Sequence, residues 1–207
     1  MTILDLTMDF HGERFPAEIK REEMPLQSGL TKYTGIIYTI THDGMSGTYI
    51  DFPGHIAETD DGVRADTFPV EDIYRVQTQV LRMHRKSGSG AVTAADLEAA
   101  AGGKLTAKNV ILNALGDLEP NDIENRSVYL DDSALDWLID NGCKLLVSDI
   151  YESQALHGVF LKLFAAGVTT VCHPVHLGKI AAREVKMTIL FSKLPITQLP
   201  CRLIVEY

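Results

Sequence analysis

The middle of the chain alternates strand-like and helix-like segments, and this alternation constrains the fold more than any other feature. Continuous apolar runs at 109–115 and 143–150 are typical of buried parallel strands. A helix is predicted between them at 131–142, because two aspartates begin that segment and a glycine ends it. A second helix is predicted at 153–167, and a strand follows at 168–173. This βαβαβ order predicts an α/β fold.

The flanking parts of the chain favour further strands. The segment 32–42 is rich in β-branched and aromatic residues, which predicts a strand. Residues 47–52 follow a glycine-containing turn, so we expect the two segments to pair as a hairpin. No stretch has the composition of an interdomain linker, and 207 residues suffice for one sizeable core. The sequence therefore predicts a single domain over residues 1–207 with a mixed sheet. Other strands are expected at 2–6, 75–84, 185–192 and 201–207, and a helix at 93–101.

Charge, hydropathy and cysteine content exclude several classes of function. The net charge is −9, and no basic stripe is present that could bind a phosphate backbone, so nucleic acid is not an expected partner. No apolar run approaches the roughly 18 residues of a membrane-spanning helix, and the acidic start is unlike a signal peptide. The three cysteines have no paired spacing. We therefore expect a protein of the reducing cytoplasm that acts on a small molecule.

The stretch SGTYIDFPGHI holds the best candidates for chemistry. Tyr49 and Asp51 share one face if the stretch is a strand, and Pro53 ends that strand. The following glycine lets His55 fold back towards Asp51, where a carboxylate could orient an imidazole for general-base work. The same pair could help to hold a divalent metal. An ordinary turn, with Asp51 capping backbone amides, is the alternative.

Two carboxylates later in the chain are also candidates. Asp149 and Glu152 follow a predicted buried strand, and the carboxyl ends of strands in α/β sheets often face a ligand crevice. They could equally cap the next helix through Ser153.

The stretch from Met45 to His55 resembles the signature of the cyclase-like metal-dependent hydrolases, a family that includes bacterial kynurenine formamidase and isatin hydrolase. That signature is His-x-Gly-Thr-His-x-Asp-x-Pro-x-His, and this chain reads Met-Ser-Gly-Thr-Tyr-Ile-Asp-Phe-Pro-Gly-His. Five of its seven fixed residues are kept. The blocks DDSALDWLIDNGCKLLVSDIYES and LFAAGVTTV also occur in the family's order, so the resemblance covers most of the chain. It implies a swivelling β/β/α fold.

The departures from the signature fall on the family's metal ligands. By position, Met45 and Tyr49 replace two histidine ligands, whereas Asp51 keeps its ligand identity. Two further metal ligands of the family, a histidine and a glutamate later in the chain, align with Phe160 and Cys172 of this sequence. His157 lies one helical turn before Phe160 on the predicted helix, where it could partly substitute. Zinc needs about three protein ligands in a catalytic site, so the site holds either no metal or one Zn²⁺ or Mn²⁺ in a remodelled shell with Asp51 and Cys172.

The resemblance implies hydrolysis of a C–N bond in a small amide or lactam, as in arylformamidases of tryptophan catabolism. In that scheme the catalytic residues are His55, Asp51 and Tyr49, with Tyr49 donating to the oxyanion. The expected substrate-binding residues are Met45, Phe52, His157 and Phe160. A pocket that binds a small molecule without chemistry is the alternative. The resemblance also implies a homodimer or homotetramer, with residues 10–29 as an arm that reaches the neighbouring subunit.

Overall fold

A nine-stranded mixed sheet forms the centre of the protein. The structure is a computed structural model, which describes residues 1–9 and 17–207. The strand order is β1-β13-β11-β5-β7-β9-β10-β4-β12, and β5, β7, β9 and β10 run parallel. The predicted α/β class with a mixed sheet is thus confirmed. The strands are β1 (Ile3–Asp5), β4 (Tyr49–Asp51), β5 (Val76–Arg82), β7 (Asn109–Asn113), β9 (Leu145–Ser148), β10 (Thr169–Cys172), β11 (Glu184–Leu190), β12 (Gln198–Pro200) and β13 (Arg202–Glu206).

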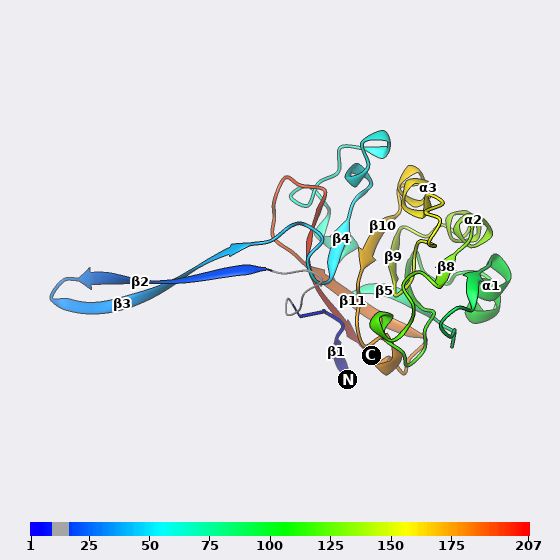
Figure 1. Cartoon of the computed structure of the whole chain (residues 1–207), viewed down its shortest axis with the longest axis horizontal. Helices are drawn as coiled ribbons and strands as arrows, with labels where there is room; N and C mark the ends of the chain where they lie inside the picture. The colour runs from blue at the N-terminus through cyan, green and yellow to red at the C-terminus, as the bar shows by residue number, and fades with distance from the viewer. Residues whose placement is uncertain (10–16) are drawn as a thin grey trace.

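Three α-helices cover one face of this sheet, as Figure 1 shows. They are α1 (Ala94–Ala101), α2 (Asp132–Asp140) and α3 (Val159–Ala165). The start of α1 is set locally, because the Thr93 hydroxyl accepts the Asp96 N–H while the Asp96 carboxylate accepts the Thr93 N–H. Gly102 ends the helix at a φ of 75°, which favours glycine. Apolar residues of the helices and of β7 and β9 form one core on this face.

A second core lies on the opposite face of the sheet. It includes Ile50, Phe52, Val147 and Val171 from the strand region, together with residues of the C-terminal strands. The strands β7 and β9 contribute apolar side chains to both cores, which explains their continuous apolar runs.

The strands β2 (Glu18–Ser28) and β3 (Thr31–Thr41) form a long hairpin that projects from the body of the protein (Figure 1). The predicted strand at 32–42 is confirmed, but its expected pairing with 47–52 is wrong. It pairs with β2 instead, so residues 18–28 of the proposed 10–29 arm form a strand. Residues 10–16 of the expected arm lie outside the described residues.

The helix expected at 153–167 begins only at Val159. Gly158 precedes it with a φ of 86°, a left-handed conformation that interrupts the helix. The residues from Ser153 to Gly158 form a loop, so His157 and Phe160 do not share a helical face as predicted. A small two-stranded sheet of β6 (Gly90–Val92) and β8 (Val128–Leu130) lies near this loop.

Within the described ranges, none of the helices has the length and the apolar composition that would let it cross a bilayer.

Candidate functional site

The short strand β4 brings the signature residues into the sheet between β10 and β12. Tyr49 lies opposite Cys172, and Asp51 lies opposite Thr170. Because directly opposed residues of antiparallel strands share a face, these four side chains lie on one side of the sheet. The Sγ of Cys172 is 4.0 Å from Oδ2 of Asp51, so two of the predicted site residues, 121 positions apart, are brought together.

Thr48 of the signature has a structural role. Its hydroxyl donates to the carbonyl oxygen of His173 at 2.7 Å and accepts the N–H of Met8 at 2.7 Å. Gly47 precedes it at a φ of 64°, a left-handed conformation that suits glycine. These contacts connect the start of β4 to the end of β10. The centroid of the His173 ring lies 5.3 Å from that of Tyr49.

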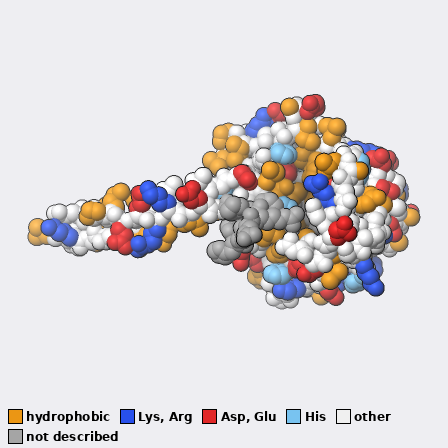
Figure 2. Space-filling view, in the orientation of Figure 1, with side chains coloured by type: hydrophobic (Ala, Val, Ile, Leu, Met, Phe, Trp, Pro, Cys, Tyr) orange, Lys and Arg blue, Asp and Glu red, His pale blue; other side chains and the backbone are white. Residues whose placement is uncertain are grey.

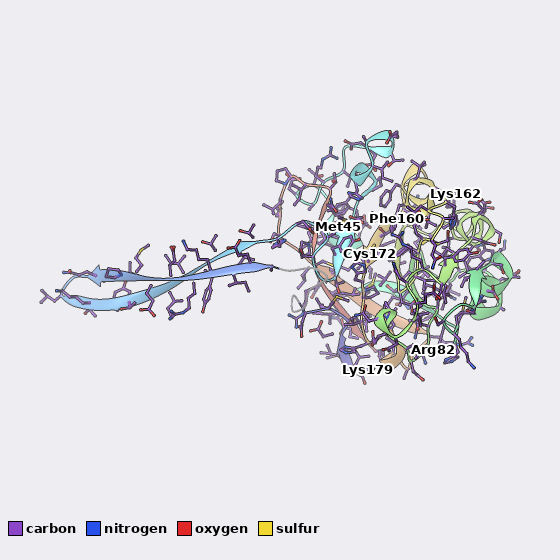
Figure 3. The ribbon with its side chains drawn as sticks, viewed as in Figure 1. Met45, Arg82, Phe160, Lys162, Cys172 and Lys179 are labelled. Atoms are coloured by element: carbon purple, nitrogen blue, oxygen red, sulfur yellow. The ribbon has the colours of Figure 1, made fainter. Side chains whose placement is uncertain are left out.

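A cavity of about 200 Å³ opens at the carboxyl ends of β9 and β10. Ligand crevices of α/β sheets occur at this edge, as predicted for Asp149 and Glu152, and both line the cavity. Tyr49, Phe160 and Cys172 line it as well, so three of the five former ligand positions converge on one hollow. Figure 3 labels Phe160 on α3 and Cys172 on β10. The remaining lining residues are Pro120, Ile123, Asn125, Arg126, Val128, Ser148, Ile150, Tyr151 and His173.

Aromatic rings form much of the cavity wall. The ring of Tyr151 lies 4.9 Å from the ring of Phe160, with an interplanar angle of 30°. The Tyr151 hydroxyl donates to the carbonyl oxygens of Leu146 and Val171, both at 2.9 Å, which leaves its ring as a fixed apolar surface. The volume is below the roughly 300–1,000 Å³ of drug-sized sites, so the ligand that fits is small.

Asp51 is buried behind Tyr49 and Cys172, and only 2% of its surface is exposed. Burial raises the pKa of this carboxyl to about 7. Its Oδ1 atom has no hydrogen-bond partner among the described residues. Burial likewise raises the pKa of the Tyr49 hydroxyl and of the Cys172 thiol well above their usual ranges. Burial therefore favours the neutral form of the Tyr49 hydroxyl and the Cys172 thiol, and it shifts the Asp51 carboxyl in the same direction.

These side chains do not fit a catalytic zinc or manganese site. Across residues 1–9 and 17–207, no group of three or more His, Cys, Asp or Glu side chains is placed to hold a metal ion. A zinc site needs about three protein ligands, and its thiol or carboxyl ligands must lose their protons. At the former ligand positions, only Asp51 and Cys172 are of the right type, and burial favours their protonated forms.

His55 follows β4 in the short 3-10 helix η1 (Pro53–His55). Its ring contacts that of Phe164, with centroids 6.4 Å apart, and burial lowers its pKa. In the described part of the chain, no hydrogen bond or ion pair joins His55 to Asp51, and His55 does not line the cavity. The expected return of His55 towards Asp51 is therefore not seen as a direct contact.

Three of the expected substrate-binding residues do not line the cavity. Phe52 is fully buried in the core, with its ring 5.0 Å from that of Phe68. Met45 is 39% exposed and precedes β4 (Figure 3). His157 does not line the cavity either, because hydrogen bonds hold its two ring nitrogens to Ser153 and to the Leu130 carbonyl.

The sequence interpretation did not single out Tyr151 or Arg126. Tyr151 stands between the two carboxylates it did single out, so the strand-end argument could have included it. Arg126 comes from a different loop, and no local pattern connects it to β9. Only the fold reveals that it lines the cavity.

The comparisons with known proteins agree with this architecture. The family model described as "Putative cyclase" matches residues 4–154. The chain is similar to a predicted metal-dependent hydrolase from Bacillus stearothermophilus, at 20% identity and a TM-score of 0.70, over 99% of this chain and 97% of that one. It is also similar to isatin hydrolase A from Labrenzia aggregata, at 14% identity and a TM-score of 0.76, over 99% and 93% of the two chains.

The corresponding isatin hydrolase from Ralstonia solanacearum has 16% identity and a TM-score of 0.76, over 99% of this chain and 91% of that one. These identities are low, so the solved structures support the fold alone. No match was found among curated proteins. Because the family model covers well over half of the 207 residues, the chain belongs to the cyclase family.

Proposed function

We propose that this protein binds a small planar carbonyl compound, of the aromatic amide or lactam type, in the cavity at the carboxyl ends of β9 and β10. The observation that carries the proposal is the lining of that cavity. Fixed aromatic surfaces from Tyr151 and Phe160 stand beside the hydroxyl of Tyr49, which can donate to a carbonyl oxygen. Two of the similar structures are isatin hydrolases bound to benzyl benzoate and to the product analogue thioisatinate, both aromatic carbonyl compounds, which supports an aromatic ligand.

Hydrolysis of the C–N bond of such a ligand is the second candidate function. Membership in the cyclase family and the retained Gly47, Thr48, Asp51, Pro53 and His55 favour it. In that scheme water attacks the carbonyl carbon, His55 handles the proton, and Tyr49 donates to the oxyanion. His55 is not among the residues that line the cavity, and this observation favours binding without turnover.

Ligand binding is tested by calorimetry and thermal shift with isatin and N-formylkynurenine on the purified wild type. Saturable binding that falls in a Phe160→Ala variant is expected, since Phe160 forms part of the wall. Wild-type binding that Phe160→Ala leaves unchanged would show that the cavity is not the site.

Turnover is followed in the same samples by the absorbance of the products. A rate that is lost in His55→Ala would establish hydrolysis with His55 in the chemistry. Equal rates in both proteins would exclude that role for His55. Elemental analysis adds a separate readout: a stoichiometric Zn²⁺ or Mn²⁺ that is lost in Asp51→Ala would overturn the metal-free description of the site.

We also propose that the β2–β3 hairpin docks on a second copy of this chain. A two-stranded hairpin alone is marginal in water, so an isolated one of this length needs a surface to pack on. The register places four exposed apolar side chains on the face proposed to dock, and four others, Met24, Leu26, Tyr33 and Ile37, on the opposite face. Figure 2 shows hydrophobic groups along the hairpin. Closed pairs of identical subunits are the commonest soluble assemblies. The four side chains on the face proposed to dock are Ile19, Ile36, Tyr38 and Ile40.

We further propose a reducing, cytoplasmic setting for the protein. Its three cysteines are all buried and unpaired, whereas a domain in an oxidising compartment commonly uses such residues in disulfides. Fractionation of source cells with an antibody against the protein tests this proposal, and recovery of the protein outside the cytoplasm would refute it.

A further inference from the structure

The loop that interrupts the expected helix brings a serine and a histidine together. Ser153 and Leu156 close a turn through the Leu156 N–H and the Ser153 carbonyl, 3.2 Å apart. Leu156 has a φ of 54°, which is unusual for a non-glycine residue. The chain then returns, and Nδ1 of His157 lies 3.0 Å from Oγ of Ser153. This distance is within the reach required of a nucleophile and its base.

The protons of this pair can be assigned from the surrounding acceptors. The Leu130 carbonyl oxygen lies 2.7 Å from Nε2 of His157 and can only accept, so in the neutral ring Nε2 carries the hydrogen. Nδ1 then carries a lone pair and no hydrogen, so the Ser153 hydroxyl must donate to it. The Ala155 N–H donates to the same Oγ at 3.2 Å, which holds the hydroxyl in place.

Glu152 provides a negative charge for the protonated form of the ring. Its Oε1 accepts the N–H of Val159 at 2.7 Å, which fixes the side chain. Its Oε2 is buried without a hydrogen-bond partner among the described residues, and it lies 3.6 Å from Nδ1 of His157. A proton arriving on Nδ1 would supply the donor that this oxygen lacks. The carboxylate therefore lies beside the nitrogen that would receive the serine proton.

A shallow hollow of about 410 Å³ lies in front of the serine. Ser153, Tyr129 and Arg126 line it, and the other lining residues are Gly88, Glu124, Ser127, Gln154 and Ala155. Arg126 lines both this hollow and the cavity beside Tyr49, whereas Ser153 lines only this hollow. Among the residues described, Arg126 forms no ion pair, so its positive charge is available to a developing oxyanion.

We propose that Ser153 and His157 form a second, independent site that hydrolyses small carboxylic esters. The Ser153 oxygen attacks the ester carbonyl carbon, its proton moves to Nδ1 of His157, and the C–O bond to the alcohol breaks as that proton passes to the leaving oxygen. Water then attacks the acyl carbon, gives its proton to His157, and releases the acid as the Ser153 hydroxyl re-forms. Glu152 is a positioning residue, and Arg126, which lines the same hollow as Ser153, is assigned to stabilise the oxyanion.

The test uses the full chain with two probes, p-nitrophenyl acetate as a substrate and diisopropyl fluorophosphate as a covalent label. One phosphoryl adduct per chain is expected, and peptide mapping should place it on Ser153. Ser153→Ala and His157→Gln should each lower the esterase rate by roughly 10²–10⁴-fold, the usual contribution of a positioned base. Ser192→Ala, at a serine outside both hollows, serves as the matched control and should keep the wild-type rate.

Glu152→Gln separates a charge effect from a structural one. The amide oxygen can still accept the Val159 N–H, but the charge beside His157 is lost. The esterase kcat should therefore fall while KM stays close to the wild-type value, because the negative charge that faces the transferred proton is lost. The other polar contacts of the ring, with Ser153 and the Leu130 carbonyl, are unchanged in this variant, as is its contact with the Tyr129 ring.

Labelling of the wild type at a different residue, or no labelling, would overturn the proposal even if the Ser153 variant failed to fold. So would a Ser153→Ala rate equal to that of the wild type. Because the ester site does not include Tyr49 or Phe160, its failure would leave the binding proposal for the first cavity unaffected, and the reverse also holds.

Discussion

The strongest quantitative prediction concerns the exposed apolar face of the β2–β3 hairpin. The double substitution Ile36→Thr and Ile40→Thr keeps β-branched residues in β3, so the hairpin itself should persist. It removes apolar surface from the face proposed to dock on a second copy. The two side chains are 51% and 58% exposed in the isolated chain.

The magnitude follows from that exposure. Full burial of an isoleucine side chain contributes about 1.5–3 kcal/mol, and about half of each side chain is available here, so each residue contributes about 1 kcal/mol to docking. With two residues on each of two hairpins, the dimer should lose about 4 kcal/mol. That corresponds to a rise of roughly a thousand-fold in the dissociation constant.

Sedimentation equilibrium over a range of protein concentrations measures this constant directly. Val70→Thr is the matched control, since Val70 is also exposed, at 65%, but lies on the body of the protein. An oligomer that dissociates equally in wild type, control and double variant would refute the hairpin as the docking element. A wild type that is monomeric at all concentrations would refute the proposed partner.

Three further predictions concern the body of the protein. Phe164→Ala should destabilise the chain by about 3–5 kcal/mol, because the ring is almost fully buried. Differential scanning calorimetry should show a fall of roughly 6–20 °C in Tm. A fall of only about 1–2 °C would contradict tight packing around this ring. Asp96→Ala removes the capping box of α1 and should lower the free energy of unfolding by about 0.5–2 kcal/mol at pH 7. The backbone hydrogen bond from Thr93 holds the pKa of Asp96 below its usual value, so this contribution is present at neutral pH and is lost as the pH falls through the folded pKa. Urea titrations should show a smaller difference in unfolding free energy between wild type and variant at pH 3 than at pH 7. An equal difference at both pH values would argue against the carboxylate. Tyr49→Phe should weaken isatin binding about 2- to 10-fold, since one neutral hydrogen bond is lost, and unchanged calorimetric affinity would place the hydroxyl outside the ligand contact.

Local patterns in the sequence determined much of the fold. The apolar runs of β7 and β9, the capping residues of α1, and the acid pair and glycine around α2 each depend on neighbours within a few positions. Such signals survive in any tertiary context, because helix caps and strand periodicity are properties of a short stretch of backbone. The signature from Met45 to His55 likewise marked β4 and its surroundings as the region of the site.

The tertiary structure alone decided what the site contains. The contact of Asp51 with Cys172, the place of Arg126 beside Tyr151, and the pairing of β3 with β2 all join residues whose sequence spacing carries no information about distance. Spacing predicts which face of a strand a side chain occupies, but not which distant strand lies beside it. The loop at Ser153–Gly158 shows the same limit, because a left-handed Leu156 and Gly158 replaced a predicted helical turn and brought Ser153 to His157.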